Sequence, residues 1–453
     1  MGDAWNGWSA AEGWTVQGWT VQGVLRCVAL AVLLALVAGC GGDGAGSGAA
    51  ADGAGRAKAS AVENPPMPGR NGGAMLVATR DADGGAIING LISQDAQPYE
   101  ESLGGPVEDN VRRIDVALLR AMDALDLPQG AMELRDVAVI AHKTDFFHFQ
   151  TIVVRTTDGG LAFLAELRRQ LHALGTDALV VEEGRGAWSV SVLGRQTHRL
   201  LFAPSKPGAP IPPVAPLAPA GGAQLVVVID DLGENVAFAR KLAALDFPVT
   251  FSVWPQSTHA AEVARLAHEA GREVLIHQPM EPQGYPRIKP GAGALLVEMD
   301  AARIAGIMSA NLDRVPFAVG VNNHMGSRFT QDEAGLAATL GVLKARGLFM
   351  LDSFTHPASQ VVPMALRVGV PVYKRDVFLD VVRDTRAILH QLEKAAAVAL
   401  HNGRAIAIGH PNRETLEALE RWQRSRDRRV AVTALASIAA LTPESAPVKA
   451  AAY

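Results

Sequence analysis

The chain has 453 residues, of which 42 are Lys or Arg and 46 are Asp or Glu, so its formal net charge is −4. This balance argues against a dedicated nucleic-acid-binding protein, and the 49% hydrophobic content argues against a wholly disordered chain. Two cysteines, Cys27 and Cys40, exclude a disulfide scaffold and a cysteine-rich zinc site. Any metal ion must therefore be held by His and carboxylate side chains. The length suits roughly two or three domains.

The N-terminal region, 1–39, has the pattern of an export signal. Residues 24–39 read VLRCVALAVLLALVAG and stand directly before Cys40. This apolar run is shorter than the roughly 20 residues of a membrane-spanning helix and is typical of the hydrophobic part of a signal peptide. The junction at 37–40 resembles a bacterial lipobox, in which the cysteine is lipidated. We expect a periplasm-facing envelope lipoprotein anchored at Cys40, in the inner or the outer membrane; a plain secretory signal is the alternative.

Residues 1–23 do not suit the start of such a signal. They hold four tryptophans and the tandem repeat WTVQGWTVQG, and the first Lys or Arg is Arg26. The segment before the hydrophobic region of a signal peptide is normally short and basic. We therefore expect translation to begin near Val24; a genuine tryptophan-rich extension is the alternative.

Two linkers divide the exported chain. Residues 40–73 are mostly Gly, Ala and Ser, and residues 204–221 are rich in proline, which predicts a flexible tether and an extended spacer. Between them, 74–203 is predicted to be a small α+β domain that binds or positions a partner, because its histidines show no ligand spacing. Its expected elements are helices at 107–125 and 160–174 and strands at 136–141, 148–155, 178–182 and 187–193.

The region 222–440 alternates short apolar strands with amphipathic helices, and 441–453 is a short tail. Such alternation predicts a parallel sheet covered by helices, here an α/β fold of the (β/α) barrel type, seven-stranded and distorted. The expected strands are 225–229, 249–253, 273–277, 317–321, 348–352, 370–374 and 405–409, and the expected helices are 235–245, 259–270, 300–313, 332–346, 384–401 and 413–426.

Polar residues stand at the carboxyl ends of six of these strands. In a parallel barrel all strands point the same way, so these residues are expected to meet at one rim, where the active sites of such barrels lie. They are Asp230 and Asp231, His277, Asn322 to His324, Asp352, Lys374 to Asp376, and His410.

This mixture of carboxylates and imidazoles suits a hydrolytic metal site. Asp231, His277 and His324 offer three N and O ligands from three strands, which leaves a position open for water. Asp230 is expected to act as general base and His410 to protonate a leaving amine. The cluster at 374–376 allows two interpretations. Lys374 or Arg375 could hold the base ionised or pair with Asp376, and a plain rim ion-pair network is the alternative.

At these residues the sequence resembles the divergent polysaccharide deacetylases, distant relatives of the NodB-type enzymes. The matching stretches are VVVIDDLG (226–233), LIHQPMEP (275–282), GVNNHMGSRFT (320–330), FMLDS (349–353), KRDVFLD (374–380) and AIGHP (407–411). The resemblance implies an envelope setting, a distorted barrel, and metal-dependent removal of N-acetyl groups from a glycan.

Carried over by position, the resemblance makes Asp230 the base, Asp231 a metal ligand, His277 the first metal-binding histidine and His410 the catalytic acid. Position 281 departs from the family pattern, because Glu281 stands where the second histidine of a His-x-x-x-His motif is expected. The third ligand is therefore His324 or Glu281, with zinc the expected ion.

Other residues are expected to support the site. Asn323 or a backbone N–H is expected to stabilise the oxyanion, with Asp352, Lys374 and Asp376 around it. The competing hypothesis is a non-catalytic glycan-binding or scaffolding lipoprotein that keeps the deacetylase fold. Neither hypothesis involves nucleic acid as a partner.

Overall fold

The computed structural model describes residues 105–142, 145–184, 186–204 and 222–443. These residues all belong to one compact unit, 72–453. The predicted export signal, Cys40, both linkers and the end of the tail lie outside the described residues, and so does the start of the predicted small domain. No helix among the described residues has the length and apolar character needed to cross a bilayer.

The first part of this unit is an α+β arrangement with a five-stranded sheet. The strands run in the order β1-β2-β5-β4-β3; β2 and β5 are parallel and the other neighbours antiparallel. Helices α1 and α2 share a core with this sheet that includes Ile114, Leu118, Phe163 and Ile152. The elements are α1 (Pro106–Ala124), a 3-10 turn (Gln129–Ala131), β1 (Met132–His142), β2 (Asp145–Thr156), α2 (Leu161–Ala173), β3 (Leu179–Gly184), β4 (Ala187–Val192) and β5 (Arg195–Pro204). The predicted elements are all present, and β5 is an additional strand.

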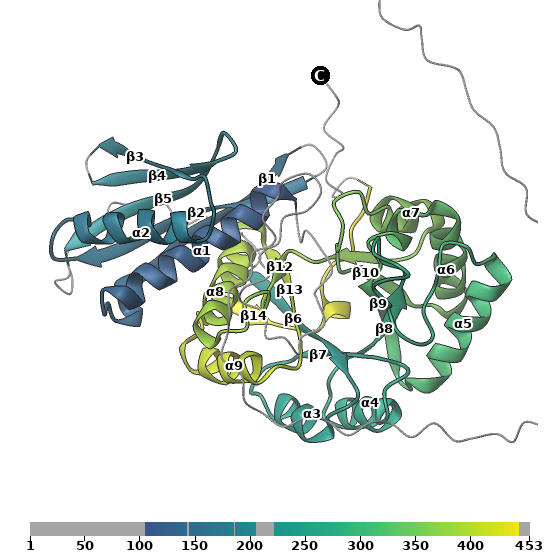
Figure 1. The fold of residues 1–453 in the computed structure, drawn as a ribbon. Coiled ribbons are helices and arrows are strands. Elements are labelled where there is room, and N and C mark those ends of the chain that lie inside the picture. The colour runs from purple at the N-terminus through teal and green to yellow at the C-terminus, as the bar shows by residue number, and fades with distance from the viewer. Residues whose placement is uncertain (1–104, 143–144, 185, 205–221, 444–453) are drawn as a thin grey trace, which may run out of the picture. The chain divides into compact units, whose positions relative to one another are not determined.

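The second part is a curled parallel sheet with helices outside it (Figure 1). Its strands are β6 (Ala223–Leu232), β7 (Thr250–Val253), β8 (Val274–Met280), β9 (Ala318–Met325), β10 (Phe349–Asp352), β11 (Val372–Lys374), β12 (Val377–Phe378), β13 (Arg404–Gly409) and β14 (Val430–Val432). Its helices are α3 (Val236–Ala243), α4 (Ala260–Glu269), α5 (Ala301–Arg314), α6 (Glu333–Arg346), α7 (Val361–Val368), α8 (Thr385–Asn402) and α9 (Arg413–Ser425), with 3-10 turns at Phe329–Gln331 and Leu435–Ser437.

The strand order explains the distortion of the barrel. The path runs β11-β10-β9-β8-β7-β6-β13-β12, and β14 pairs with β6 beside it. Its two ends, β11 and β12, come from one chain segment and are separated by only two residues, Arg375 and Asp376. β11 pairs with β10, and β12 pairs with β13. One short segment thus bridges both sides of the ring. The seven predicted strands are all present, β12 and β14 are additional to the predicted number, and the predicted (β/α) barrel class is confirmed.

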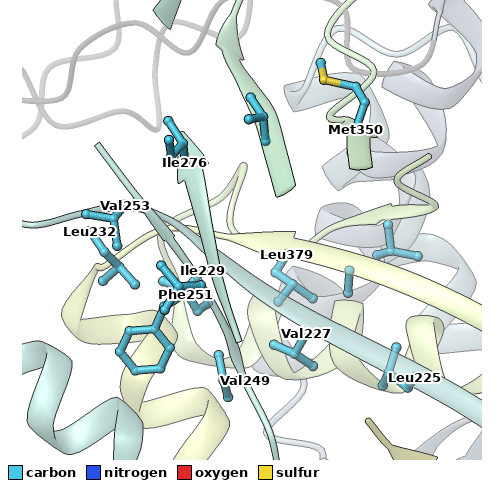
Figure 2. Close-up of a cluster of buried hydrophobic side chains, with 14 of the residues drawn as sticks. Leu225, Val227, Ile229, Leu232, Val249, Phe251, Val253, Ile276, Met350 and Leu379 are labelled. Atoms are coloured by element: carbon cyan, nitrogen blue, oxygen red, sulfur yellow. The ribbon is translucent and has the colours of Figure 1, made fainter. Parts of the chain in front are cut away.

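Strands β7, β8 and β10 are buried along their whole length and therefore on both faces, which explains the continuous apolar runs in the sequence. Along β6, Leu225, Val227 and Ile229 pack in the layer between the sheet and its helices, which Figure 2 shows. The alternate residues Val226 and Val228 pack inside the barrel with partners from other strands. Helix α7 is absent from the prediction because Pro363 interrupts its short apolar pattern.

Candidate metal centre and active site

Three donor atoms from three strands meet at the carboxyl ends of the sheet. Nε2 of His277 and Nδ1 of His324 lie 3.2 Å and 3.1 Å from Oδ1 of Asp231, and the two nitrogens are 3.1 Å apart. A tetrahedral ion with bonds of about 2.0–2.1 Å holds its ligands about 3.3 Å apart. Oδ1 of Asp231 is buried and has no hydrogen-bond partner. Among the described residues, this trio could hold a metal ion, and its chemistry and spacing fit a divalent one.

A β-bulge brings both aspartates of β6 to this site. β6 pairs with β7 at Ile229 and next at Leu232, opposite Phe251 and Val253, so one extra residue is inserted. Asp231 takes a left-handed φ of 53°, a conformation that Asp adopts more readily than most residues. Neighbouring side chains on a regular strand point to opposite faces. Here they lie on either side of one imidazole: Asp231 near Nε2 of His277, and Oδ2 of Asp230 3.6 Å from Nδ1.

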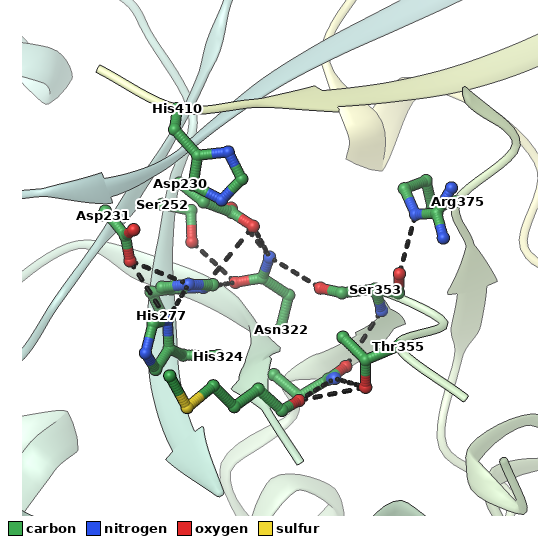
Figure 3. Close-up of polar contacts among 12 residues, drawn as sticks. Asp230, Asp231, Ser252, His277, Asn322, His324, Ser353, Thr355, Arg375 and His410 are labelled. Atoms are coloured by element: carbon green, nitrogen blue, oxygen red, sulfur yellow. Dashed lines mark hydrogen bonds and ion pairs between the residues drawn. The ribbon is translucent and has the colours of Figure 1, made fainter. Parts of the chain in front are cut away.

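Asn322 of β9 occupies the centre of the polar network (Figure 3). Its Nδ2 lies 2.8 Å and 3.0 Å from the two carboxylate oxygens of Asp230 and 3.2 Å from the Ser353 hydroxyl. Its Oδ1 lies 2.6 Å from the Ser252 hydroxyl and 2.9 Å from Nδ1 of His277. The predicted base and a predicted metal ligand are therefore joined through one amide.

Charge and burial shift the pKa values of Asp231 and His277 in opposite directions. Burial alone would raise the pKa of Asp231, but the imidazoles of His324 and His277 hold the pKa of this carboxyl well below its usual value. Burial would lower the pKa of His277, but the Asp230 and Asp231 carboxylates raise it. A cation bound among these three side chains would take the place of the charge interaction between the carboxylate and the two imidazoles.

His410 is held by a buried carboxylate that has no role in the sequence-based hypothesis. Asp380 accepts hydrogen bonds from the backbone N–H of His410 and from its Nδ1, at 2.6 Å and 3.0 Å, and from the hydroxyl of Thr415. Burial works to lower the pKa of His410, but Asp380, with smaller effects from Asp231 and Asp230, raises it to about 9. His410 is therefore an imidazolium at neutral pH. Its ring is drawn beside Asp230 in Figure 3.

Two of the predicted supporting residues hold loops together. Asn323 donates to the carbonyl of Met325 and accepts from the backbone N–H of Ser353, at 2.7 Å and 2.9 Å. Asp352 accepts from the backbone N–H of Phe354 and the hydroxyl of Ser359, both at 2.8 Å. Burial raises the pKa of Asp352. These bonds commit both side chains to loop structure, so the oxyanion role of Asn323 stays a prediction.

The cluster at 374–376 also serves packing. Lys374 lies over the rings of Phe354 and Phe146, at 3.6 Å and 4.7 Å. Arg375 is buried and donates to the carbonyls of Ser353 and Phe354, and Asp376 accepts from the backbone N–H of Ile406. Burial lowers the pKa of Arg375 to about 9 and raises that of Asp376. These contacts join the three residues to backbone groups and to two aromatic rings, and both interpretations of the cluster stay predictions.

Glu281 and His324 are the two candidates for the third metal ligand, and their side chains have different surroundings. The Glu281 carboxylate is buried, accepts the backbone N–H of Val297 at 2.7 Å, and pairs with Arg328 at 2.6 Å. Its carbonyl also accepts the N–H groups of Arg328 and Phe329. Glu281 therefore joins two loops, and His324 completes the donor trio.

Residues without a role in the sequence-based hypothesis complete the site. Trp254, the residue directly after β7, has its ring centroid 4.4 Å from that of His324. Ser252 lies two residues earlier on the same strand. Two further site residues stand next to predicted ones in the sequence and could have been found there. Asp380 ends the matching stretch KRDVFLD, and Asn322 directly precedes Asn323 and His324. Nothing in the local pattern of β7 distinguished Ser252 or Trp254.

Comparisons with known proteins show the family of the barrel. Residues 227–439 match the family model described as divergent polysaccharide deacetylase. Uncharacterized protein YibQ of Escherichia coli K12 is 38% identical over 197 residues, 44% of this chain and 61% of that protein. An uncharacterized protein of Haemophilus influenzae is 32% identical over 198 residues, 44% of this chain and 70% of that one. The chain belongs to the divergent polysaccharide deacetylase family. The matched part of the chain covers 61% of the Escherichia coli relative, which is less than two thirds of its length.

Solved structures with similarity to this family member include uncharacterized protein ATU2773 of Agrobacterium tumefaciens C58. It is 26% identical, with a TM-score of 0.45, over 48% of this chain and 88% of that one. A family 4 carbohydrate esterase from Streptomyces lividans, in complex with acetate, is 13% identical with a TM-score of 0.30, over 49% and 98% of the two chains.

Proposed function

We propose that the barrel is a metal-dependent hydrolase that removes N-acetyl groups from an envelope or extracellular glycan. The observation that carries the proposal is the donor trio Asp231, His277 and His324, with the buried carboxylate of Asp230 3.6 Å from Nδ1 of His277 and the imidazolium of His410 drawn beside that carboxylate in Figure 3. A hydrolytic metal site needs three N or O ligands with an open position, a base and an acid. Membership of a deacetylase family supports amide hydrolysis on a sugar.

The proposed ligands are the three donor atoms of this trio, and zinc is the proposed ion because it is bound by N and O ligands with tetrahedral spacing. When bound, such an ion would polarise the acetamide carbonyl and lower the pKa of a water molecule. The exposed fraction of the Asp231 side chain is 29%, against 3% for His277, so substrate would approach from the Asp231 side.

Asp230 and His410 divide the proton transfers. Asp230 would take a proton from the attacking water, because its carboxylate is oriented at both oxygens by Asn322. His410 would give its proton to the departing amine, since Asp380 keeps the ring protonated at neutral pH. General acid or base catalysis of this kind contributes typically 10²–10⁴-fold to a rate.

The test is acetate release from N-acetylated glycans by the purified protein with one equivalent of Zn²⁺, beside Asp230→Asn and His410→Gln. Acetate release that falls at least about 100-fold in both variants, with zinc still bound, supports the proposal. Stoichiometric zinc without acetate release from any N-acetylated glycan would instead favour the glycan-binding alternative, which a direct binding assay on the same glycans would then test.

We also propose that the chain is an envelope lipoprotein with lipid on Cys40. The support is the apolar run at 24–39 and the lipobox-like junction at 37–40. Mass spectrometry of the mature N-terminal peptide tests this proposal. A diacylglyceryl-modified Cys40 is expected, and an unmodified N-terminus cleaved elsewhere contradicts it.

A further inference from the structure

We propose that Asn322 is a positioning residue that sets the tautomer of His277 and orients the carboxylate of Asp230. The inference deepens the proposed function and rests on it for the roles of His277 and Asp230. It depends on five contacts of one buried amide to four residues, Asp230, Ser252, His277 and Ser353, which lie on or directly after four different barrel strands.

The orientation of the Asn322 amide is set by charge. A carboxylate only accepts hydrogen bonds, and both oxygens of Asp230 lie within 3.0 Å of one end of the amide. That end must be the NH₂ group. The oxygen end therefore faces Ser252 and Nδ1 of His277, and both of these groups must donate to it.

The tautomer of His277 follows from this orientation. With its proton on Nδ1, the neutral ring presents a lone pair on Nε2, the atom that faces Asp231 and His324. A histidine that binds a metal ordinarily donates its other N–H to an acceptor, which fixes the tautomer and the ring orientation. Asn322 supplies that acceptor from the neighbouring strand, where it is directly paired with His277.

The same amide holds Asp230 with a neutral donor. Bonds to both oxygens restrict rotation of the carboxylate, while an amide adds no positive charge beside it. Asn322 thereby couples the geometry of the proposed base to that of a proposed ligand.

The first experiment measures the tautomer directly in metal-free protein. Long-range ¹H–¹⁵N spectra of histidine-labelled protein, with His277 assigned by its absence in His277→Gln, distinguish a proton on Nδ1 from one on Nε2. The wild type is expected to show Nδ1–H, and Asn322→Asp is expected to keep it, because a carboxylate also accepts. Absence of a proton from Nδ1 of His277 in the wild type would overturn the proposal, whereas a second proton on Nε2, beside the Asp231 carboxylate, is compatible with it.

The second experiment measures zinc affinity by competition with a chromophoric chelator. Asn322→Ala is expected to weaken binding 10–100-fold, the usual effect of losing such a partner. Asn322→Asp is expected to stay within about threefold of the wild type or to bind more tightly, yet to lose acetate release because it no longer donates to Asp230. Gln150→Ala, which removes a buried amide from β2 of the other sheet, is the control and should leave zinc affinity unchanged.

The two variants distinguish a positioning role of Asn322 from a general loss of structure around it. Equal loss of zinc affinity in Asn322→Ala and Asn322→Asp, or unchanged affinity in Asn322→Ala, contradicts the role of Asn322. If Asn322→Ala does not fold, Asn322→Asp and the tautomer measurement decide the question. A wild type that binds no zinc defeats the proposed function, while the tautomer in metal-free protein still tests this inference.

Discussion

At the residue scale, the site depends on a strand that departs from regular geometry. Two adjacent aspartates reach the same imidazole only because β6 is bulged and Asp231 has a left-handed φ. Non-glycine residues in this region carry strain that the surrounding structure must offset, and they cluster at functional sites. Met325 and Phe354, at the ends of the neighbouring strands β9 and β10, share this conformation with φ values of 52° and 51°.

The ligand assignment leads to a comparison of two single variants. His324→Ala removes one of three donor atoms, so zinc bound at micromolar protein concentration is expected to fall below 0.1 equivalent. Glu281→Gln is expected to keep full occupancy, because the Glu281 carboxylate contacts Val297 and Arg328 and not the donor trio. Metal content by plasma mass spectrometry measures both. Zinc lost in Glu281→Gln and kept in His324→Ala would reverse the assignment.

The Asp380–His410 pair predicts a pH dependence. The pKa of His410 is raised to about 9 by Asp380, so His410 is protonated below that pH and activity that needs its proton falls as pH rises through about 9. Asp380→Asn removes the charge and should move this alkaline limb toward the ordinary histidine value of about 6.5. A pH profile of acetate release measures the shift. An alkaline limb that stays near its wild-type position would exclude His410 as the acid.

At the element scale, α8 carries a buried cation between two helices. Lys394 is 1% exposed and lies 3.5 Å from Glu108 and 3.4 Å from Asp115, both on α1. His148 and His198 also bond these carboxylates. Such buried pairs are strongly destabilising to break, because one charge is left without compensation. The network therefore links α1, β2 and β5 to a barrel helix.

Removing the lysine tests this link. Lys394→Ala is expected to lower the free energy of unfolding by about 3–5 kcal/mol, measured by urea denaturation at pH 7. Lys344→Ala, which removes an exposed lysine that bonds a carbonyl, is the control and should change it by less than about 1 kcal/mol. A loss from Lys394→Ala no larger than that of the control would mean that the network does not hold these elements together.

The same carboxylates predict acid sensitivity. Burial would raise the pKa of Asp115, but Lys394, His198 and His390 hold it well below its usual value. A carboxyl with a lowered pKa in the folded chain stabilises the fold above the unfolded value of about 3.9 and loses this contribution as pH falls toward the folded pKa. Melting temperature should therefore fall steeply below about pH 4, and more steeply in the wild type than in Asp115→Asn. Parallel curves for the two proteins would contradict this.

At the scale of the whole molecule, two separate sheets lie within one unit, joined by the Lys394 network and by the contact of Lys374 with Phe146. Among the described residues, the candidate trio and the Asp380–His410 pair both belong to the barrel, so the proposed chemistry lies there. The first sheet contributes charged and aromatic partners to barrel elements. This arrangement favours a stabilising or positioning role for the first sheet.

Truncation is the corresponding test. Without residues preceding 222, Lys394 loses both carboxylates and Lys374 loses one of its two rings. The fragment 222–453 is therefore expected to melt at a lower temperature than the full chain, by more than about 5 °C, in a thermal scan followed by circular dichroism. A fragment that melts as high as the full chain would contradict this role.

The fold and most of the site could be predicted from the chain alone. Continuous apolar runs that alternate with amphipathic helices identify the barrel strands, and parallel strands gather their carboxyl ends at one rim, so Asp230, His277 and His410 could be placed together. The choice between Glu281 and His324, the role of Asn322 and the Asp380 partner depended on the tertiary structure. Local patterns specify which residues of a strand are buried. The β6 bulge, the contacts of Asn322 and the Asp380–His410 pair depend instead on how strands far apart in the sequence pair and align with one another.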